Sequence, residues 1–341
     1  MNKPASVRIM SAEEIASLGS SDVPHLQLPD RVRYFPERQM RLRQLARSHA
    51  MGDFLQFVAN IVKAQQEALE RMPDVPLPDL KALSQATQQG RPGLSIEHWP
   101  RDGAWQQALQ HIVQAVLDEA PEATRTSLQA LTQASPEHLE AQADALLGLS
   151  ATTLQLDTAP LIGAALQVYW VHLLTRIQAQ HPKQQASSLF GRTDHAQLCP
   201  CCGSEPVASI TRQQGAALSQ RYLHCALCGT EWHLQRSRCS HCLDDKQLAY
   251  QSLDLADADP EDSASRVTKA AVQAEECGQC RHYLKIMHTD RDPFVEPVAD
   301  DLATLTLDLL MADTGMTRHG HNLALIFHDG GGSADDPGGA S

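Results

Sequence analysis

Aromatic residues and long hydrophobic runs are both scarce in this chain of 341 residues. It contains only six Phe, five Tyr and four Trp, so a core must be built mainly from Leu, Ala, Val and Ile, which favours helices over a large β-sandwich. The longest apolar stretch, 161–171, contains a glutamine and is followed by a histidine. It is far shorter than the roughly 20 residues that a membrane-spanning helix needs. We therefore expect a buried helix at this stretch and no membrane span.

Positive charge is also in short supply. The 28 Lys and Arg residues are outnumbered by 41 Asp and Glu, which gives a net charge of −13, so phosphate backbones and anionic lipids would repel the chain as a whole. The first ten residues lack the apolar segment and small-residue cleavage pattern of a secretory signal. These absences predict a cytoplasmic protein that does not bind nucleic acid.

Three widespread catalytic signatures are missing from the sequence. It contains no Walker-type phosphate loop, no Gly-x-Ser-x-Gly turn and no His-Glu-x-x-His motif. We therefore predict a binding protein without catalytic residues or an organic cofactor site.

Composition changes along the chain and divides it into six segments. Apolar residues recur at spacings of three and four from residue 39 to near Met72 and again further on, which predicts helices. The later predicted helices cover 105–120, 121–132, 136–149 and 161–179, with Ser135 as the N-cap of the third. The segments are an irregular lead-in (1–38), a helical domain (39–185), two cysteine modules (186–236 and 237–292), a C-terminal helix with its extension (293–328) and a disordered Gly-rich tail (329–341).

The C-terminal helix is predicted to begin at Asp300 and to end at Gly315, a residue suited to a helix C-terminus. Its leucines at 302, 305, 309 and 310 are expected to point inward. Short strands are predicted within the cysteine region at 207–210, 267–272 and 283–288.

All nine cysteines lie between residues 199 and 280, and eight of them form four C-x2-C motifs. A disulfide framework is a poor explanation, because cytosolic thiols are kept reduced. Two thiolates at this spacing face one point from a tight turn, and two such turns form a tetrahedral four-sulfur cage. The sequence therefore predicts two metal ions. The candidate ligands are Cys199, Cys202, Cys225, Cys228, Cys239, Cys242, Cys277 and Cys280.

The grouping of the motifs is a question of topology. Sequential grouping gives C-x2-C-x22-C-x2-C and then C-x2-C-x34-C-x2-C, and it needs no long crossing connection. An interleaved cross-brace, in which the first motif joins the third, is less favoured. Gly203 and Gly229 follow two of the motifs, where ribbon and rubredoxin knuckles need a positive φ. Leu243 and Arg281 follow the other two and match this pattern less closely.

Three chemistries remain open at these motifs. Structural zinc is the simplest, because a metal can replace the hydrophobic core that small modules lack. Iron in the same geometry would be redox-active. Thioredoxin-like catalysis fits poorly, since the motifs do not stand at a helix start that follows a βαβ strand.

The residues around the motifs are expected to play smaller parts. Cys201, inside the first motif, is expected to point outward as a free thiol. Four cysteines already satisfy a tetrahedral metal, so the nearby histidines are expected to be surface or supporting groups. The histidines concerned are His224, His233, His241 and His282.

The charge of the cysteine region bears on its partner. Residues 190–290 carry 10 Lys and Arg against 13 Asp and Glu without a basic run, which favours a protein partner over DNA or RNA.

Together these patterns predict a multidomain α and β protein. An N-terminal all-helical domain is followed by two tandem rubredoxin-like or zinc-ribbon-like four-cysteine metal modules and a C-terminal helix. The expected cofactors are two metal ions, iron or zinc. The oligomeric state is left open, a homo-oligomer included.

Two stretches of the cysteine region, 221–233 and 239–242, resemble the FdhE family of formate dehydrogenase accessory proteins. The stretches 30–38 and 299–305 support this resemblance, which spans most of the chain. Four C-x2-C motifs behind a helical domain are a more specific combination than any single motif.

The resemblance implies a cytoplasmic maturation factor for respiratory formate dehydrogenase, a molybdenum-containing enzyme exported through the twin-arginine pathway. Its partner would be the catalytic subunit of that enzyme before export, and the family's rubredoxin-like knuckles fall on the eight cysteines named above. The residues alone leave two alternatives. One is a rubredoxin-like electron-transfer protein, and the weaker one is a zinc-ribbon protein that binds nucleic acid.

Overall fold

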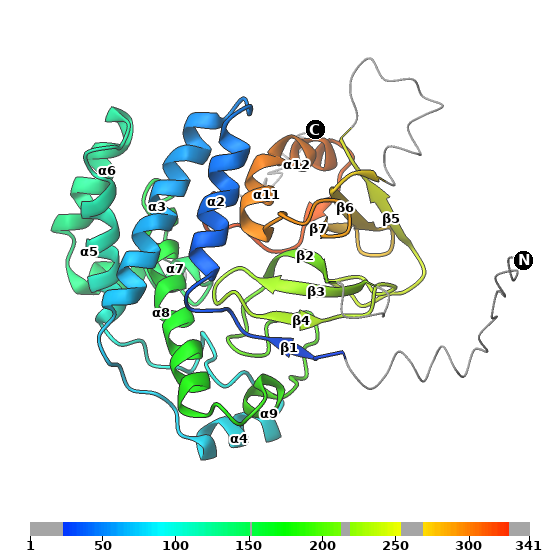
Figure 1. The fold of residues 1–341 in the computed structure, drawn as a ribbon, viewed down its shortest axis with the longest axis horizontal. Coiled ribbons are helices and arrows are strands. Elements are labelled where there is room, and N and C mark those ends of the chain that lie inside the picture. The colour runs from blue at the N-terminus through cyan, green and yellow to red at the C-terminus, as the bar shows by residue number, and fades with distance from the viewer. Residues whose placement is uncertain (1–22, 151, 213–218, 254–268, 327–341) are drawn as a thin grey trace, which may run out of the picture.

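The computed structural model describes residues 23–150, 152–212, 219–253 and 269–326. Within these ranges, a group of helices lies on one side of the molecule and a β-sheet on the other, and two C-terminal helices cover part of the sheet (Figure 1). The tail that was expected to be disordered, 329–341, lies outside the described residues. None of the described helices is long and apolar enough to cross a membrane.

The helical region surrounds one central, almost entirely buried helix, α8 (Ala159–Gln180). Its side chains include Tyr169 and Trp170, both with no exposed surface, because α3, α5 and α7 pack around it. Ser135 caps α7 as predicted, accepting a hydrogen bond from the His138 amide. The remaining helices are α2 (Tyr34–Ala46), α3 (Gly52–Arg71), α4 (Leu80–Gln88), α5 (Ala104–Val116), α6 (Glu122–Gln133), α7 (Pro136–Leu146) and α9 (Ala186–Phe190).

Two helices differ from the sequence-based expectation. Helix α2 begins at Tyr34, inside the segment expected to be irregular, because the Asp30 carboxylate accepts hydrogen bonds from the amides of Val32 and Arg33 at the approach to the helix. Helix α4 follows three prolines and was not predicted. The Asp79 carboxylate caps it by accepting a hydrogen bond from the Ala82 amide at 2.7 Å.

The strands of both cysteine modules form one sheet, in the order β1-β4-β3-β2-β7-β6-β5, with β8 beside β7. Within each module the strands pair antiparallel. Parallel pairing of β2 with β7, where Ser209 lies opposite Ile286, joins the modules. The strands are β1 (Leu26–Gln27), β2 (Pro206–Arg212), β3 (Gln220–Cys225), β4 (Glu231–His233), β5 (Leu248–Gln251), β6 (Val272–Cys277), β7 (His282–His288) and β8 (Thr317–Arg318).

Two predicted strands, those at 207–210 and 283–288, correspond to β2 and β7. The strand predicted at 267–272 is placed wrongly. Residues 267 and 268 lie outside the described residues, and strand β6 begins only at Val272.

The C-terminal segment forms two helices, α11 (Pro297–Ala303) and α12 (Leu305–Asp313), where one was predicted. The chain turns at Thr304, whose hydroxyl donates to the Asp300 carbonyl at 2.7 Å. This break changes which side chains face inward: Leu307 is buried, whereas Leu309 is 62% and Leu310 is 49% exposed. The expected inward orientation of the last two is therefore wrong. Gly315 follows α12 with the expected positive φ of 73°.

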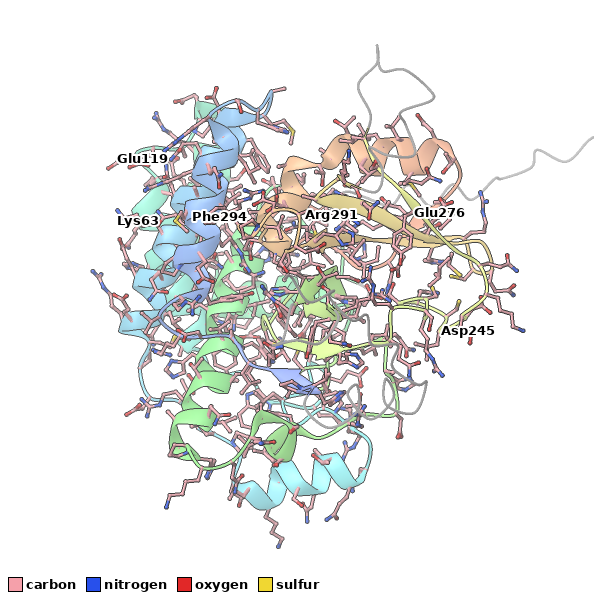
Figure 2. All side chains as sticks on the ribbon, turned by 45° about the vertical axis from the view of Figure 1, so that its right-hand side comes forward. Lys63, Glu119, Asp245, Glu276, Arg291 and Phe294 are labelled. Atoms are coloured by element: carbon pink, nitrogen blue, oxygen red, sulfur yellow. The ribbon has the colours of Figure 1, made fainter. Side chains whose placement is uncertain are left out.

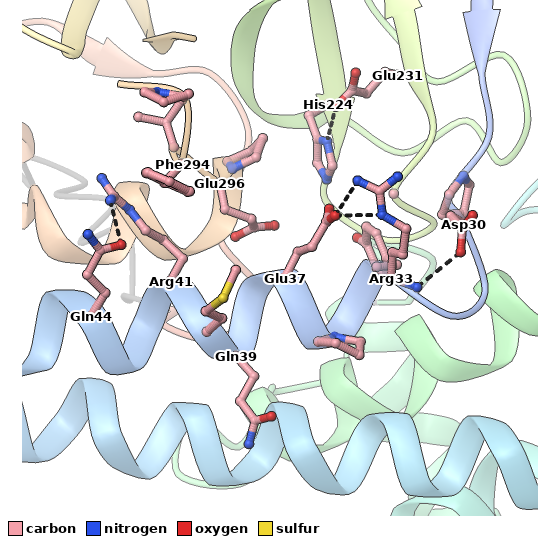
Figure 3. A pocket seen from close by; sticks show the side chains of 18 of the residues that line it. Asp30, Arg33, Glu37, Gln39, Arg41, Gln44, His224, Glu231, Phe294 and Glu296 are labelled. Carbon is pink, nitrogen blue, oxygen red and sulfur yellow. Dashed lines mark hydrogen bonds and ion pairs between the residues drawn. The ribbon is translucent and has the colours of Figure 1, made fainter. Parts of the chain in front are cut away.

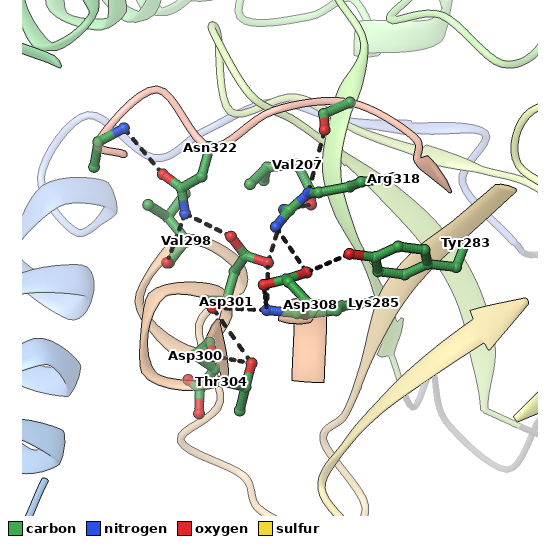
Figure 4. Close-up of polar contacts among 12 residues, drawn as sticks. Val207, Tyr283, Lys285, Val298, Asp300, Asp301, Thr304, Asp308, Arg318 and Asn322 are labelled. Atoms are coloured by element: carbon green, nitrogen blue, oxygen red, sulfur yellow. Dashed lines mark hydrogen bonds and ion pairs between the residues drawn. The ribbon is translucent and has the colours of Figure 1, made fainter. Parts of the chain in front are cut away.

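A buried charge network fixes the C-terminal segment to the sheet (Figure 4). The fully buried Lys285 ammonium lies 2.5 Å from an Asp308 oxygen and 3.2 Å from an Asp301 oxygen. The Arg318 guanidinium pairs with the same two carboxylates at 3.2 and 2.7 Å, and Tyr283 donates a hydrogen bond to Asp308. Two cations and two anions balance one another, which compensates the cost of removing them from water.

A second set of ion pairs joins the two ends of the described chain. The Arg38 guanidinium on α2 lies 2.9 Å from the Glu296 carboxylate, a residue 258 positions further along the chain. Arg41 contacts both oxygens of Asp300, at 2.9 and 2.6 Å. These pairs hold the segments 38–41 and 296–300 close together, although they are distant in sequence.

Candidate metal centres

The first cluster consists of Cys199, Cys202, Cys225 and Cys228, all of which are buried. The sulfurs of Cys199 and Cys228 lie 3.5 Å apart, and those of Cys202 and Cys225 lie 3.4 Å apart. A tetrahedral ion with metal–sulfur bonds of about 2.3 Å requires sulfurs about 3.8 Å apart. The sulfurs therefore surround a position that one such ion fits after a small expansion.

The second cluster consists of Cys239, Cys242, Cys277 and Cys280. Its sulfur–sulfur distances of 3.7 Å and 3.8 Å match a tetrahedral ion closely. Cys239 and Cys277 are buried, but Cys242 is exposed. Each cluster joins two consecutive motifs, so the structure has the sequential grouping and not the cross-brace.

All four knuckles share one backbone conformation. The residue after each motif has a positive φ, which is 84° at Gly203, 70° at Gly229, 63° at Leu243 and 59° at Arg281. The amides at 203, 243 and 281 donate to the carbonyl of the first cysteine of their motif. Leu243 and Arg281 thus adopt the glycine conformation despite a cost of roughly 1–2 kcal/mol for a side chain there. The absence of glycine after the third and fourth motifs therefore did not indicate a different knuckle conformation.

Backbone amides point at the sulfurs of both clusters. In the first cluster, the Cys225 sulfur accepts from the amides of Leu227 and Cys228 at 3.4 and 3.3 Å. In the second, the Cys239 sulfur accepts from the amides of His241 and Cys242 at 3.3 and 3.5 Å. Such hydrogen bonds stabilise negative charge on sulfur, which metal binding requires.

The electrostatics of the first cluster also suit a cation. Burial raises the pKa of the Cys199, Cys225 and Cys228 thiols. Burial acts in the same direction on Cys202, but hydrogen bonds from the neighbouring thiols outweigh it and lower the pKa of Cys202. Four thiols in an apolar site do not all ionise without a compensating positive charge. A bound metal ion supplies that charge, so the donor set fits a metal.

The first cluster is built into the helical region. The amides of Leu94 and Ile96 donate to the carbonyls of Cys201 and Cys202 at 2.8 and 2.9 Å. The Gln167 side chain, from the central helix α8, donates to the Ala226 carbonyl at 2.7 Å. A Cβ atom at residue 229 would collide with the ring of Tyr34 on α2, so this glycine is required by contact as well as by φ.

Cys201 is fully buried in the main hydrophobic core. The expectation of an outward-pointing thiol is wrong, because the first knuckle packs against the segment around Leu94 instead of facing solvent. Cys201 belongs to neither cluster.

The four histidines near the motifs contribute to neither four-sulfur cluster. His224 is buried, with Nδ1 3.2 Å from the Glu231 carboxylate. Burial by itself raises the pKa of Glu231, but the Arg212 guanidinium and His224 together outweigh burial and lower it to about 2. His241 and His282 stack on each other beside the second cluster. Nothing in the sequence indicated this stacking beyond the position of each histidine inside, or two residues after, a C-x2-C motif.

A cavity of about 1000 Å³ lies between α2, the segment 293–297 and the strand ends near Glu231 (Figure 3). Its lining includes Met40 and Phe294, which are 60% and 61% exposed. Arg43 and Arg47 also line it. The sequence did not reveal this cavity, because its residues come from opposite ends of the chain.

Three family profiles match the chain in consecutive order. They are "FdhE, N-terminal" at residues 23–187, "FdhE, central domain" at 198–236 and "FdhE, C-terminal domain" at 237–325. The chain belongs to the FdhE family. The resemblance found in the sequence is thereby confirmed, and the boundary between the central and C-terminal FdhE profiles falls between the two clusters.

Individual FdhE proteins match nearly the whole chain. "Protein FdhE homolog" from Klebsiella pneumoniae strain 342 is 39% identical over 325 residues, which cover 93% of this chain and 97% of the relative. "Protein FdhE" from Salmonella newport strain SL254 is 38% identical over 333 residues, which cover 95% and 99%. The crystal structure of the FdhE protein from Pseudomonas aeruginosa superposes with a TM-score of 0.75 at 36% identity, covering 89% of this chain and 99% of that chain.

Proposed function

We propose that this chain is a cytoplasmic maturation protein for respiratory formate dehydrogenase, whose catalytic subunit it binds before export. The observation that carries this proposal is the match to FdhE proteins over 95% of the chain, including both cysteine clusters. The structural features support a binding role: two compact clusters, and one large cavity whose lining combines exposed apolar side chains with basic and acidic groups. Expression in a strain that lacks its own FdhE protein tests the role directly, because formate dehydrogenase activity should return.

The eight clustered cysteines are proposed to hold two metal ions. Such an ion would pin two turns of the chain to one point, and iron would add one-electron redox chemistry. Elemental analysis and a visible spectrum of anaerobically purified protein, produced without added metal, test this. Two irons with thiolate-to-iron charge-transfer bands identify iron centres, and two zincs without visible bands identify zinc centres. Less than one ion per chain contradicts the assignment.

The cavity beside α2 is proposed as the docking surface for the catalytic subunit. Met40 and Phe294 are two of the most exposed large apolar side chains among the described residues. Arg43 and Arg47 have no ion pair among the described residues, although the chain as a whole is acidic. An apolar segment with acidic flanks, still accessible in an incompletely folded subunit, has the matching chemistry.

Binding measurements with the purified catalytic subunit test this surface. Phe294→Asp and Met40→Asp should each weaken binding about tenfold or more, because they place a charge in the apolar contact. Leu309→Asp is the matched control, since Leu309 is 62% exposed but lies on α12 outside the cavity. Wild-type affinity in both cavity variants would refute the location.

A cysteine double variant tests the docking role of the first module. Cys225→Ala with Cys228→Ala should abolish metal retention at the first cluster and binding of the catalytic subunit. Circular dichroism shows whether the helices remain folded. Unchanged affinity in this variant would exclude the first module from docking.

A further inference from the structure

Two imidazole rings lie directly against the second cluster. His241 stands between Cys239 and Cys242, and His282 follows Cys280 by two residues. The rings stack with their centres 3.7 Å apart and their planes 5° from parallel. A nitrogen of each ring and the Cys280 sulfur all lie within 4.8 Å of one another. This group of two histidines and one cysteine has only Cys280 in common with the four cysteines of the second cluster.

Both rings have a nitrogen that is free to bind a metal. The Nδ1 atom of His282 lies 2.8 Å from the Cys280 carbonyl oxygen. Because a carbonyl only accepts, Nδ1 carries the proton and the lone pair is on Nε2. The Nδ1 atom of His241 is buried and has no hydrogen-bond partner among the described residues. A buried nitrogen without a partner is costly in a folded protein, unless an ion or ligand completes it.

The surroundings favour a cation over other ligands. The ring of His319 lies edge-on to His241, with ring centres 5.1 Å apart, and its Nδ1 atom is 3.1 Å from the Ser240 hydroxyl. The Glu205 carboxylate adds a negative charge close to His241 and His319. Within the described part of the chain, no comparable pair of imidazoles accompanies the first cluster, where His224 is held by Glu231.

We propose that His241, His282 and the Cys280 thiolate form a third metal site, which binds a divalent cation of the zinc class. Two imidazoles and a thiolate suit zinc, cobalt or nickel rather than magnesium or calcium. Cys280 belongs to both groups of ligands, so its thiolate would serve both sites, and water or a ligand from a partner would supply the remaining donor. A shared ion would require the three ligand atoms, which lie within 4.8 Å of one another, to move closer together.

Cobalt titration of the zinc-loaded chain tests the site. The chain is first given only two equivalents of zinc, which is spectroscopically silent, to fill both clusters, and Co²⁺ is then added while the content of both metals is measured. We expect one cobalt per chain in addition to two zincs, with a new sulfur-to-cobalt charge-transfer band. His241→Ala with His282→Ala should weaken cobalt binding by about 100-fold while it retains two zincs.

The controls separate this site from the second cluster and from surface histidines. Retention of two zincs in the double variant shows that the four-sulfur cages are intact, whether or not the proposed maturation role is correct. His138→Ala, an exposed histidine on α7, should bind cobalt as the wild type does. The third site is refuted when cobalt only displaces zinc, when no third ion binds, when the double variant binds equally well, or when cobalt binds without the sulfur band.

Discussion

The first cluster lies within the main hydrophobic core, whereas the second lies at the turn between β6 and β7, where Cys242 is exposed. All four cysteines of the first cluster belong to the same core as the helices α3, α5 and α8. In Figure 2 Asp245, three residues after Cys242, lies at the edge opposite Lys63 and Glu119 of the helical region. A separate small apolar cluster, made by Ala274 and Tyr283 of the second module with Leu307 and Met311 of α12, lies apart from that core, although Leu284 and Met287 of β7 still belong to the main core.

The same C-x2-C spacing therefore occurs in two different environments, one enclosed by a hydrophobic core and one partly open to solvent. In the first module a bound metal would add to a hydrophobic core that is already large, and contacts with α2 and α8 fix the knuckles. In the second module buried ion pairs around Lys285 replace much of that core, and one cysteine remains open to solvent. We infer that the first cluster stabilises the whole chain, whereas the second is suited to exchange with the surroundings.

Removing the cysteines of one cluster at a time should have the largest effect on stability, and the effect should differ between the two clusters. Cys199→Ser with Cys202→Ser should destabilise the helical region as well, because metal binding at a structural site contributes about 10 kcal/mol or more and this cluster lies in the shared core. Cys239→Ser with Cys242→Ser should leave the helices folded. Far-UV circular dichroism during thermal unfolding measures both, and equal losses of helix would contradict the comparison.

Disruption of the charge network should have the next largest effect. Lys285→Met leaves Asp301 and Asp308 with one cation fewer, which should lower the free energy of unfolding by about 3–5 kcal/mol. Lys63→Met removes an exposed ion pair with Glu67 and should cost less than about 1 kcal/mol. Urea unfolding monitored by tyrosine and tryptophan fluorescence gives both values. A small effect of Lys285→Met would show that ion pairs do not hold the second module.

Metal removal should distinguish the clusters by rate. A chelator should take the ion from the second cluster at least about tenfold faster than from the first, because exposed Cys242 offers a sulfur that can be protonated and displaced. Released metal is followed with a colorimetric indicator, and mass spectrometry after alkylation identifies which cysteines have become free. Simultaneous release from both clusters would mean that burial does not control access.

The smallest expected effect concerns acid, because a lower pH should destabilise the helical region through His172 and the clusters through their thiolates. Burial and the positive charges of Arg31 and Arg176 lower the pKa of His172 on α8 to about 4, from 6.5. The folded state therefore binds fewer protons than the unfolded state between these values, so the stabilisation is complete above pH 6.5 and is lost as the pH falls towards 4. Protonation of thiolates adds an acid response at the clusters. The pH dependence of the urea midpoint should accordingly be shallower in His172→Gln but should not vanish.

Local patterns in the sequence predicted much of this molecule. The C-x2-C spacing depends on a single tight turn, so the eight cysteines could be read from short segments, whereas their sequential grouping was predicted from the lengths of the connections between motifs. Helix periodicity and the cap at Ser135 are likewise local. The FdhE resemblance was carried by contiguous motifs, and the comparisons confirm it.

Only the tertiary structure decided how these local pieces meet. The pairing of β2 with β7, the burial of Cys201 and the cavity beside α2 all join segments distant in sequence, where no local pattern specifies a partner. The stacking of His241 on His282 has the same origin, since two knuckles of one cluster bring the rings together. Short-range backbone preferences thus determined the elements and candidate ligands, while long-range packing determined that one cluster is enclosed and the other is open.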